Sequence, residues 1–241
     1  LKRDEAEGIF VYREEFNVEN VDYCLTGIVC RVKLCEFSEK VVLPHEETLT
    51  KAKTDRFNLM CNTGCNFSSI YSLYNDESGV IAEVIANKVK EAPIHRFTDE
   101  EEVTHTLWKI DCEEGVSKIV NALADKQLFI ADGHHRYETA LNFKKHCYET
   151  GILPEGIDVD YVMMTLVDMD DKGLVVFPTH RLIVDKAVCK KDIAEKCADD
   201  FNTSVKPLSD LKDALKAGEN GITYITTAFN VEPVNSFREL G

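Results

Sequence analysis

The segment that most constrains the fold of this chain is residues 128–141, which read Leu-Phe-Ile-Ala-Asp-Gly-His-His-Arg-Tyr-Glu-Thr-Ala-Leu. A short apolar run ends at Asp132-Gly133, and a helix-compatible sequence follows directly. This pattern predicts a buried strand, a tight turn and the start of a helix. In α/β proteins, turns of this kind are where ligands commonly bind.

The turn itself carries residues suited to binding an anion. A helix N-terminus offers unpaired backbone N–H groups and a partial positive charge. Gly133 lets the backbone approach a ligand closely, and the planar guanidinium of Arg136 matches phosphate or carboxylate. The alternative is that Asp132 merely caps the helix and that the basic residues are solvated. Because so many polar residues gather after one apolar strand, we favour the anion site.

The adjacent histidines, His134 and His135, raise the alternative of a metal site. An α-helix has about 3.6 residues per turn, so neighbouring side chains point about 100° apart. One of the two could bind a metal together with Asp132 or His180, but both can hardly bind the same ion. The turn therefore favours phosphate over a histidine-rich metal centre.

A second polar cluster begins at residues 44–48, Pro-His-Glu-Glu-Thr, and continues through Lys53 and Arg56. We expect a helix over residues 44–60, which would place Glu46 and Lys53, seven residues apart, on one face. Proline followed by acidic residues is ordinary helix-start chemistry. The functional alternative makes Glu46 a general base and His45 or Lys53 a phosphate contact.

A third cluster, Pro178-Thr179-His180-Arg181, stands at the predicted start of a strand, where it could be functional or simply a capped strand entrance. The single tryptophan, Trp108, follows the alternating pattern of His105-Thr106-Leu107 and is expected in the core.

The remaining pattern predicts a mixed α/β (α+β) fold with a central mixed sheet flanked by helices. Strands are expected at residues 9–13, 25–37, 69–74, 103–110, 128–131 and 161–169, and further helices at 80–89, 113–125 and from the turn to 150. Residues 1–185 are expected to form the main domain, which carries the site. Residues 186–241 are expected to form a partial C-terminal lobe.

Composition narrows the classes of function. The net charge of −15 argues against a nucleic-acid or anionic-membrane partner, because both need clustered Lys and Arg. No apolar run approaches the roughly 18 residues of a membrane helix, and no signal peptide is recognisable. An odd number of cysteines, nine, without a C-x-x-C pair favours reduced thiols in a cytoplasm over disulfides or a zinc ribbon. No motif for haem or flavin was found either, and we expect a small-molecule ligand.

Several motifs occur together in a known family. They are Pro44-His45-Glu46-x-Thr48, Lys53-x-Asp55-Arg56, Trp108, Ala131-Asp132-Gly133-His134-His135-Arg136-Tyr137-Glu138-Thr139 and Pro178-Thr179-His180-Arg181. In this order they resemble a widespread prokaryotic family, domain-of-unknown-function family 1015. The resemblance weakens after about residue 190. Members of that family are longer, so we expect this chain to be a fragment of a longer protein.

The turn also resembles, more distantly, the phosphate-binding turn of the ParB/sulfiredoxin-like fold, which includes kinases acting on free serine. In sulfiredoxin a cysteine follows the glycine, whereas here His134 stands in that place, so sulfinic acid reduction is not expected. ParB proteins use the turn in a DNA-associated switch, which the acidity of this chain argues against. The resemblance implies a ParB/sulfiredoxin-like core that binds a nucleotide, ATP or ADP, with Mg²⁺.

The most specific function that this resemblance implies is phosphoryl transfer to a small hydroxyl-bearing metabolite. Its catalytic residues would be Glu46, which deprotonates the acceptor, Asp132, which supports Mg²⁺ or orients His134, and His134 itself. The phosphates would be bound by Gly133, His135 and Arg136, with His45, Lys53, Arg56, His180 and Arg181. Two alternatives stay open: a non-catalytic regulator that binds a nucleotide or metabolite, and a metal-dependent hydrolase.

Overall fold

The computed structural model describes residues 7–18, 20–46, 51–154, 156–176 and 195–196, with the backbone alone at residues 51–53. The chain divides into two compact units, Leu1–Val176 and Phe177–Gly241, and the elements below all belong to the first. The predicted lobe of residues 186–241, its boundary after residue 185, and the cluster containing His180 and Arg181 lie outside the described residues.

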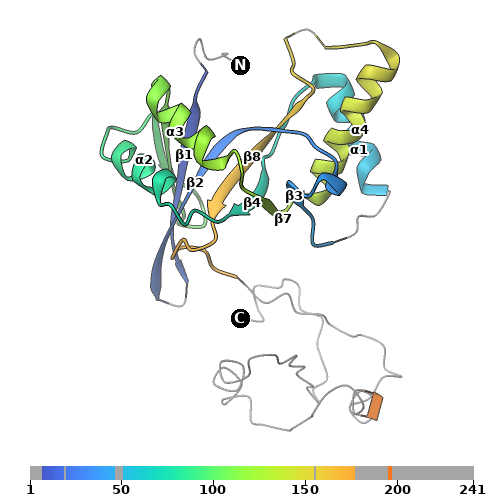
Figure 1. The fold of residues 1–241 in the computed structure, drawn as a ribbon. Helices are drawn as coiled ribbons and strands as arrows, with labels where there is room; N and C mark the ends of the chain where they lie inside the picture. The colour runs from blue at the N-terminus through green and yellow to red at the C-terminus, as the bar shows by residue number, and fades with distance from the viewer. Residues whose placement is uncertain (1–6, 19, 47–50, 155, 177–194, 197–241) are drawn as a thin grey trace. The chain divides into compact units, whose positions relative to one another are not determined.

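The described residues of the first unit form one sheet of eight strands in the order β3-β7-β4-β8-β2-β1-β6-β5 (Figure 1). The pairs β3/β7 and β4/β8 are parallel and the other neighbours are antiparallel. The sheet is therefore mixed, which confirms the predicted fold class. In chain order the strands are β1 Ile9–Val18, β2 Val21–Lys33, β3 Val42–Leu43, β4 Ile70–Tyr74, β5 His95–Thr98, β6 Thr104–Ile110, β7 Leu128–Asp132 and β8 Tyr161–Asp168.

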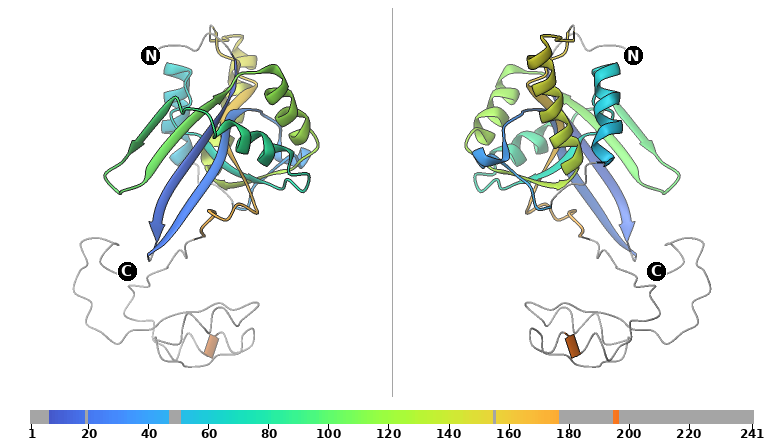
Figure 2. Two further views of the ribbon diagram at one scale, coloured as in Figure 1. Left: turned by 90° about the vertical axis from the view of Figure 1, so that its left-hand side faces the viewer. Right: turned by 90° about the vertical axis from the view of Figure 1, so that its right-hand side faces the viewer.

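The helices associate in two pairs, as the two side views in Figure 2 show. They are α1 Lys51–Thr63, α2 Val80–Lys88, α3 Glu113–Leu123 and α4 His134–Thr150, with one 3-10 turn, η1, at Phe37–Glu39. Helix α2 packs beside α3, and α1 packs beside α4. Among the described residues, no helix has both the length and the apolar character that crossing a membrane requires.

Strand alternation gives the sheet two different faces. On the first face, Val11, Ile28 and Leu166 from adjacent strands are at most 1% exposed. They join one core cluster with residues of α2, α3 and α4, including Ile81 and Tyr137. Since side chains alternate along a strand, the intervening residues form the second face of the sheet, to which Tyr12 and Tyr71 belong. The buried residues of the first face are the apolar residues at every second position from which the strands were predicted.

Most predicted elements are confirmed within a few residues, including the strand, turn and helix of residues 128–141. The helix predicted over residues 44–60 is wrong at its start, because Pro44 to Glu46 are not helical and α1 begins at Lys51. Two strands were missed. β3 has only two residues, and every residue of the edge strand β5 is exposed, so neither carries an apolar pattern.

The predicted strand over residues 25–37 instead runs over Val21–Lys33. It ends early because the chain turns away to contact α4, where the Tyr137 hydroxyl accepts from the Cys35 N–H and donates to the Cys35 carbonyl. Such a long-range contact has no local signal in the sequence.

Candidate functional site

The turn between β7 and α4 is built around Gly133. β7 ends at Asp132, Gly133 is the N-cap residue with φ 101°, and α4 begins at His134. That positive φ favours glycine. The N-cap position is taken by Gly133, which has no side chain to cap the helix, and Asp132 lies one residue before it, so the alternative role of Asp132 as the capping residue is wrong. The turn thus presents the N-terminus of a 17-residue helix.

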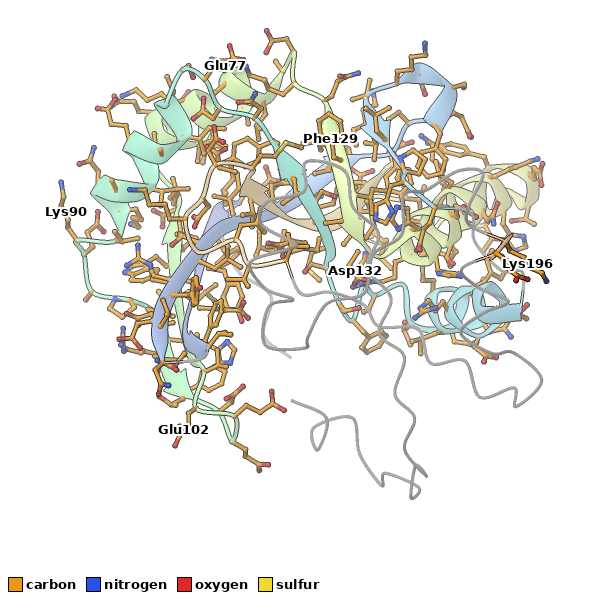
Figure 3. The ribbon with its side chains drawn as sticks, turned by 90° about the horizontal axis from the view of Figure 1, so that it is seen from below. Glu77, Lys90, Glu102, Phe129, Asp132 and Lys196 are labelled. Atoms are coloured by element: carbon orange, nitrogen blue, oxygen red, sulfur yellow. The ribbon has the colours of Figure 1, made fainter. Side chains whose placement is uncertain are left out.

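Arg136 folds back over this N-terminus. One of its terminal nitrogens, Nη2, contacts the Asp132 carboxylate, and the other, Nη1, donates to the Ser69 carbonyl and to Ser68 Oγ (3.1 Å). Its guanidinium lies so close to Gly133 that a Cβ there would come within 2.9 Å of it. Figure 3 labels Asp132 at the end of β7, beside β4. Arg136 therefore connects the turn to the start of β4.

His134 is buried, with 1% of its side chain exposed. Its Nε2 accepts the backbone N–H of His45 (3.2 Å), which places the proton of the neutral ring on Nδ1. Nδ1 lies 3.1 Å from Glu46 Oε1, yet the pair lacks the alignment of a hydrogen bond, so this buried nitrogen has no hydrogen-bond partner among the described residues. Burial, and secondly the neighbouring His45, hold the pKa of His134 below its usual value, although Glu46 opposes the shift.

The segment from Pro44 to Glu46 is attached to the turn by both the backbone and the ring of His45. His45 Nε2 donates to the Ala131 carbonyl (3.3 Å), and the His45 ring meets the His134 ring edge-on at 4.4 Å between centroids. These contacts, together with the pairing of β3 with β7, fix residues 44–46 in a non-helical conformation where a helix was predicted. Glu46 therefore does not share a helix face with Lys53.

The remaining predicted residues are placed less centrally. The half-buried His135 follows His134, and its carbonyl accepts from Thr139 Oγ1 (2.6 Å). Arg56 is an exposed residue of α1, and Lys53 lies in the first turn of the same helix. The structure thus brings together His45, Glu46, Asp132, Gly133, His134 and Arg136.

The metal alternative named Asp132, one of the adjacent histidines and His180, and of these His180 lies outside the described residues. Within the ranges the structure describes, no group of three or more His, Cys, Asp or Glu side chains is arranged to hold an ion. The carboxylate of Asp132 contacts Arg136, and among the described residues the carboxylate of Glu46 lies 3.1 Å from Nδ1 of His134.

Three residues of this site were missed from the sequence. Ser68 and Ser69 precede β4 and hold Arg136, and Tyr71 of β4 pairs with Asp132 of β7. The one sequence feature that pointed to Ser68 and Ser69 was their position directly before an apolar strand. It becomes meaningful only when the pairing of β4 with β7 is known, because these strands are far apart in the sequence.

Comparison with known families gives a match that covers nearly the whole chain. The model of a family described as "Protein of unknown function (DUF1015)" matches residues 1–236. The chain belongs to the DUF1015 family. Comparison of this DUF1015 protein with curated proteins and with solved structures found no significant match. The ParB/sulfiredoxin-like core therefore stays a prediction.

Proposed function

We propose that this DUF1015 protein binds the phosphates of a nucleotide, ATP or ADP, at the β7–α4 turn. We propose further that it transfers a phosphoryl group to a small hydroxyl-bearing metabolite. The observation that carries the proposal is the position of the Arg136 guanidinium over Gly133, at the N-terminus of α4. Both the helix end and the guanidinium attract an anion.

A second observation at the same turn supports a ligand there. The buried Nδ1 of His134 has no hydrogen-bond partner among the described residues, and buried polar atoms in native proteins are nearly always paired. An acceptor hydroxyl that approached Glu46 would also come close to this nitrogen, because the two groups are 3.1 Å apart.

Phosphate binding would displace Asp132 from Arg136. The Asp132 side chain is 76% exposed, so its carboxylate can return to water at little cost, as is typical of surface ion pairs. A phosphate oxygen pair would then take its place on the planar guanidinium. In the absence of ligand, the Asp132 carboxylate thus occupies the position on Arg136 that the phosphate would take.

In the transfer reaction, Glu46 would accept the proton of the acceptor hydroxyl. Its side chain is half exposed and can reach a substrate, whereas His134 is buried and neutral and would hold the segment that carries Glu46. Phosphoryl transfer relies mainly on positioning and charge neutralisation. Mg²⁺ would arrive with the nucleotide, since it commonly binds through phosphates and one or two carboxylates, and Asp132 is the carboxylate at hand.

We place the protein in the cytoplasm as part of the same proposal. The seven described cysteines are free thiols, which suits a reducing compartment.

The test is a thermal-shift and calorimetry series on the full-length chain with ATP, ADP and CTP, each with Mg²⁺. A ligand at about 100 times its Kd adds about 2.7 kcal/mol to stability, which raises the melting temperature of a protein of this size by about 5 °C or more. Arg136→Ala should weaken binding about tenfold or more. Arg31→Ala, which removes an arginine from a surface ion pair with Glu7, is the matched control and should bind as wild type does.

Turnover is tested with Glu46→Gln, which should abolish phosphoryl transfer while leaving nucleotide binding intact. If wild type binds nucleotide but transfers nothing to a panel of hydroxyl compounds, the protein is the non-catalytic regulator. If no nucleotide shifts the melting temperature, or if Arg136→Ala binds as well as wild type, the turn is not the phosphate site.

A further inference from the structure

A cleft of about 190 Å³ crosses the second face of the sheet, over strands β1, β2, β4 and β8. Its polar lining comes from Tyr12, Glu14, Ser69, Tyr71 and Thr165, and its apolar lining from strands β2 and β8. Pockets for drug-sized ligands measure about 300–1,000 Å³. This cleft therefore suits a compact ligand and is too small for a nucleotide.

Glu14 is held in the cleft by a network of side chains. Its Oε1 accepts the Tyr12 hydroxyl (2.8 Å), and the same hydroxyl oxygen lies 2.6 Å from His105 Nδ1. His105 Nε2 in turn lies 3.0 Å from Asp99 Oδ2. The network orders the Glu14 side chain through one oxygen, and a third of that side chain stays exposed. A positioned carboxylate of this kind can accept a ligand's hydrogen bonds without first being ordered.

The two tyrosines of the cleft remain uncharged at neutral pH. Burial, and secondly the nearby Glu14 and Asp171, raise the pKa of Tyr71 to about 12. Burial, and secondly the hydrogen bond to Glu14, also raise the pKa of Tyr12. Glu14 is therefore the one charged side chain among the described residues that line the cleft.

We propose that this cleft binds a small organic cation, with an alkylammonium group placed against Glu14 and between the rings of Tyr12 and Tyr71. A carboxylate flanked by aromatic rings attracts an ammonium group through charge and cation–π interaction. The net charge of −15 adds a field that draws cations toward the protein. The hydroxyls of Ser69 and Thr165, 2.7 Å apart, offer polar contacts to a ligand that also carries a hydroxyl group.

This binding site is separate from the phosphate site, although the two are neighbours. The Ser69 carbonyl accepts from Arg136, and Tyr71 pairs with Asp132. Ser69 and Tyr71 thus border both sites, but the ammonium group would be placed against Glu14 of β1, and the cleft is lined by no residue from Asp132 to Arg136. Either proposal can therefore fail while the other stands.

The experiment titrates the full-length chain with choline and, in parallel, with its uncharged isostere 3,3-dimethylbutan-1-ol, by calorimetry or ligand-observed NMR. Ethanolamine and propan-1-ol form a second pair. We expect at least one cation to bind about tenfold or more tightly than its neutral counterpart, and Glu14→Gln to remove that preference. Glu7→Gln, at an exposed carboxylate paired with Arg31, is the control and should bind as wild type does.

A second variant covers the chance that Glu14→Gln disturbs the hydrogen-bond network. Tyr71→Leu removes an aromatic wall and should weaken cation binding several-fold, whereas Tyr71→Phe keeps the ring and should retain it. The proposal is overturned if neither cation binds better than its neutral partner at millimolar concentration, or if Glu14→Gln or Tyr71→Leu binds like wild type. All of these titrations are run without nucleotide, so their outcome is distinguishable from a failure at the phosphate site.

Discussion

Two histidines of this protein lie beside carboxylates in very different surroundings. His134 has 1% of its side chain exposed, one ring nitrogen bonded to the His45 N–H, and the other near Glu46 without an aligned hydrogen bond. His105 is 15% exposed, and both of its ring nitrogens have close partners, Tyr12 on one side and Asp99 on the other. The first ring joins two segments of backbone, and the second belongs to a side-chain network on the sheet.

The difference teaches how burial outweighs a neighbouring charge. Glu46 would favour a protonated His134, yet burial dominates and the pKa of His134 is lowered. At Asp99 burial is the smaller influence. The hydrogen bond with His105 is the largest one, and it lowers the pKa of Asp99. One histidine is thus kept neutral by its surroundings, while the other helps to keep a carboxylate charged. Four predictions test this comparison, from the largest expected effect to the smallest.

The first prediction compares removal of each ring. His134→Ala should lower the free energy of unfolding by about 2–4 kcal/mol, because it leaves a cavity and an unpaired His45 N–H. His105→Ala should cost only about 1 kcal/mol, since its partners are about a third exposed and can be rehydrated. Urea unfolding measures both, with the exposed His95→Ala as a control expected within about 0.5 kcal/mol of wild type. Equal losses for the two rings would break the comparison.

The second prediction concerns the glycine that precedes His134. Gly133→Ala should destabilise the protein by about 1–2 kcal/mol and displace Arg136, because the new Cβ would lie within 2.9 Å of the guanidinium. Gly151→Ala is the matched control, since Gly151 also has a positive φ, 70°, but no atom within 4 Å of an added Cβ. Only Gly133→Ala should weaken nucleotide binding in a titration. Comparable binding losses in both variants would refute the role given to Arg136.

The third prediction is a pH dependence that comes from His134. Its pKa is lowered in the folded state, whereas in the unfolded chain it is about 6.5. The unfolded state therefore binds the proton more readily, so stability is complete above about pH 6.5 and falls as the pH drops toward the lowered value. Urea unfolding between pH 5 and pH 8 should show this slope, and His134→Gln should flatten it. A wild-type protein that gains stability on acidification over this range would contradict the assignment.

The fourth and smallest effect lies at more acidic pH and belongs to Asp99. Its pKa is lowered by the hydrogen bonds from His105 and the Val103 N–H. The stabilisation is present above the unfolded value of about 3.9 and is lost as the pH falls through the lowered folded value. Melting temperatures measured from pH 5 to pH 3 should fall less steeply in Asp99→Asn than in wild type. Asp125→Asn, at another exposed carboxyl, should keep the wild-type slope.

The sequence-based predictions were accurate where an element depends on residues close together in the sequence, and wrong where it depends on contacts between distant residues. β7 and α4 were predicted correctly because an apolar run, a glycine and a long helix-compatible stretch are all local signals. The helix expected from Pro44 was wrong at its start because His45 is held by Ala131 and His134, which are distant in sequence. Local propensity had no means of weighing those contacts against a helix.

The candidate site followed the same rule. The sequence identified Gly133, His134 and Arg136 as members of one turn, and the family model supports membership of DUF1015. The sequence could not indicate that Arg136 contacts Ser69, or that His134 is buried while Glu46 is half exposed. Burial depends on what packs around a side chain, so the roles of these two residues could be told apart only in the folded protein.

The sequence by itself thus determined the strand, the glycine turn and the helix of residues 128–141, the mixed α/β class, and the position of Arg136 in the first turn of that helix. These features depend on the conformational preferences and periodicity of neighbouring residues. The tertiary structure alone decided which segments meet at the turn, which histidine is buried, and that Tyr12, Glu14 and Tyr71 line one cleft. Those outcomes depend on strand order in the sheet, β4 beside β7 and β2 beside β1, which brings together residues that no local pattern connects.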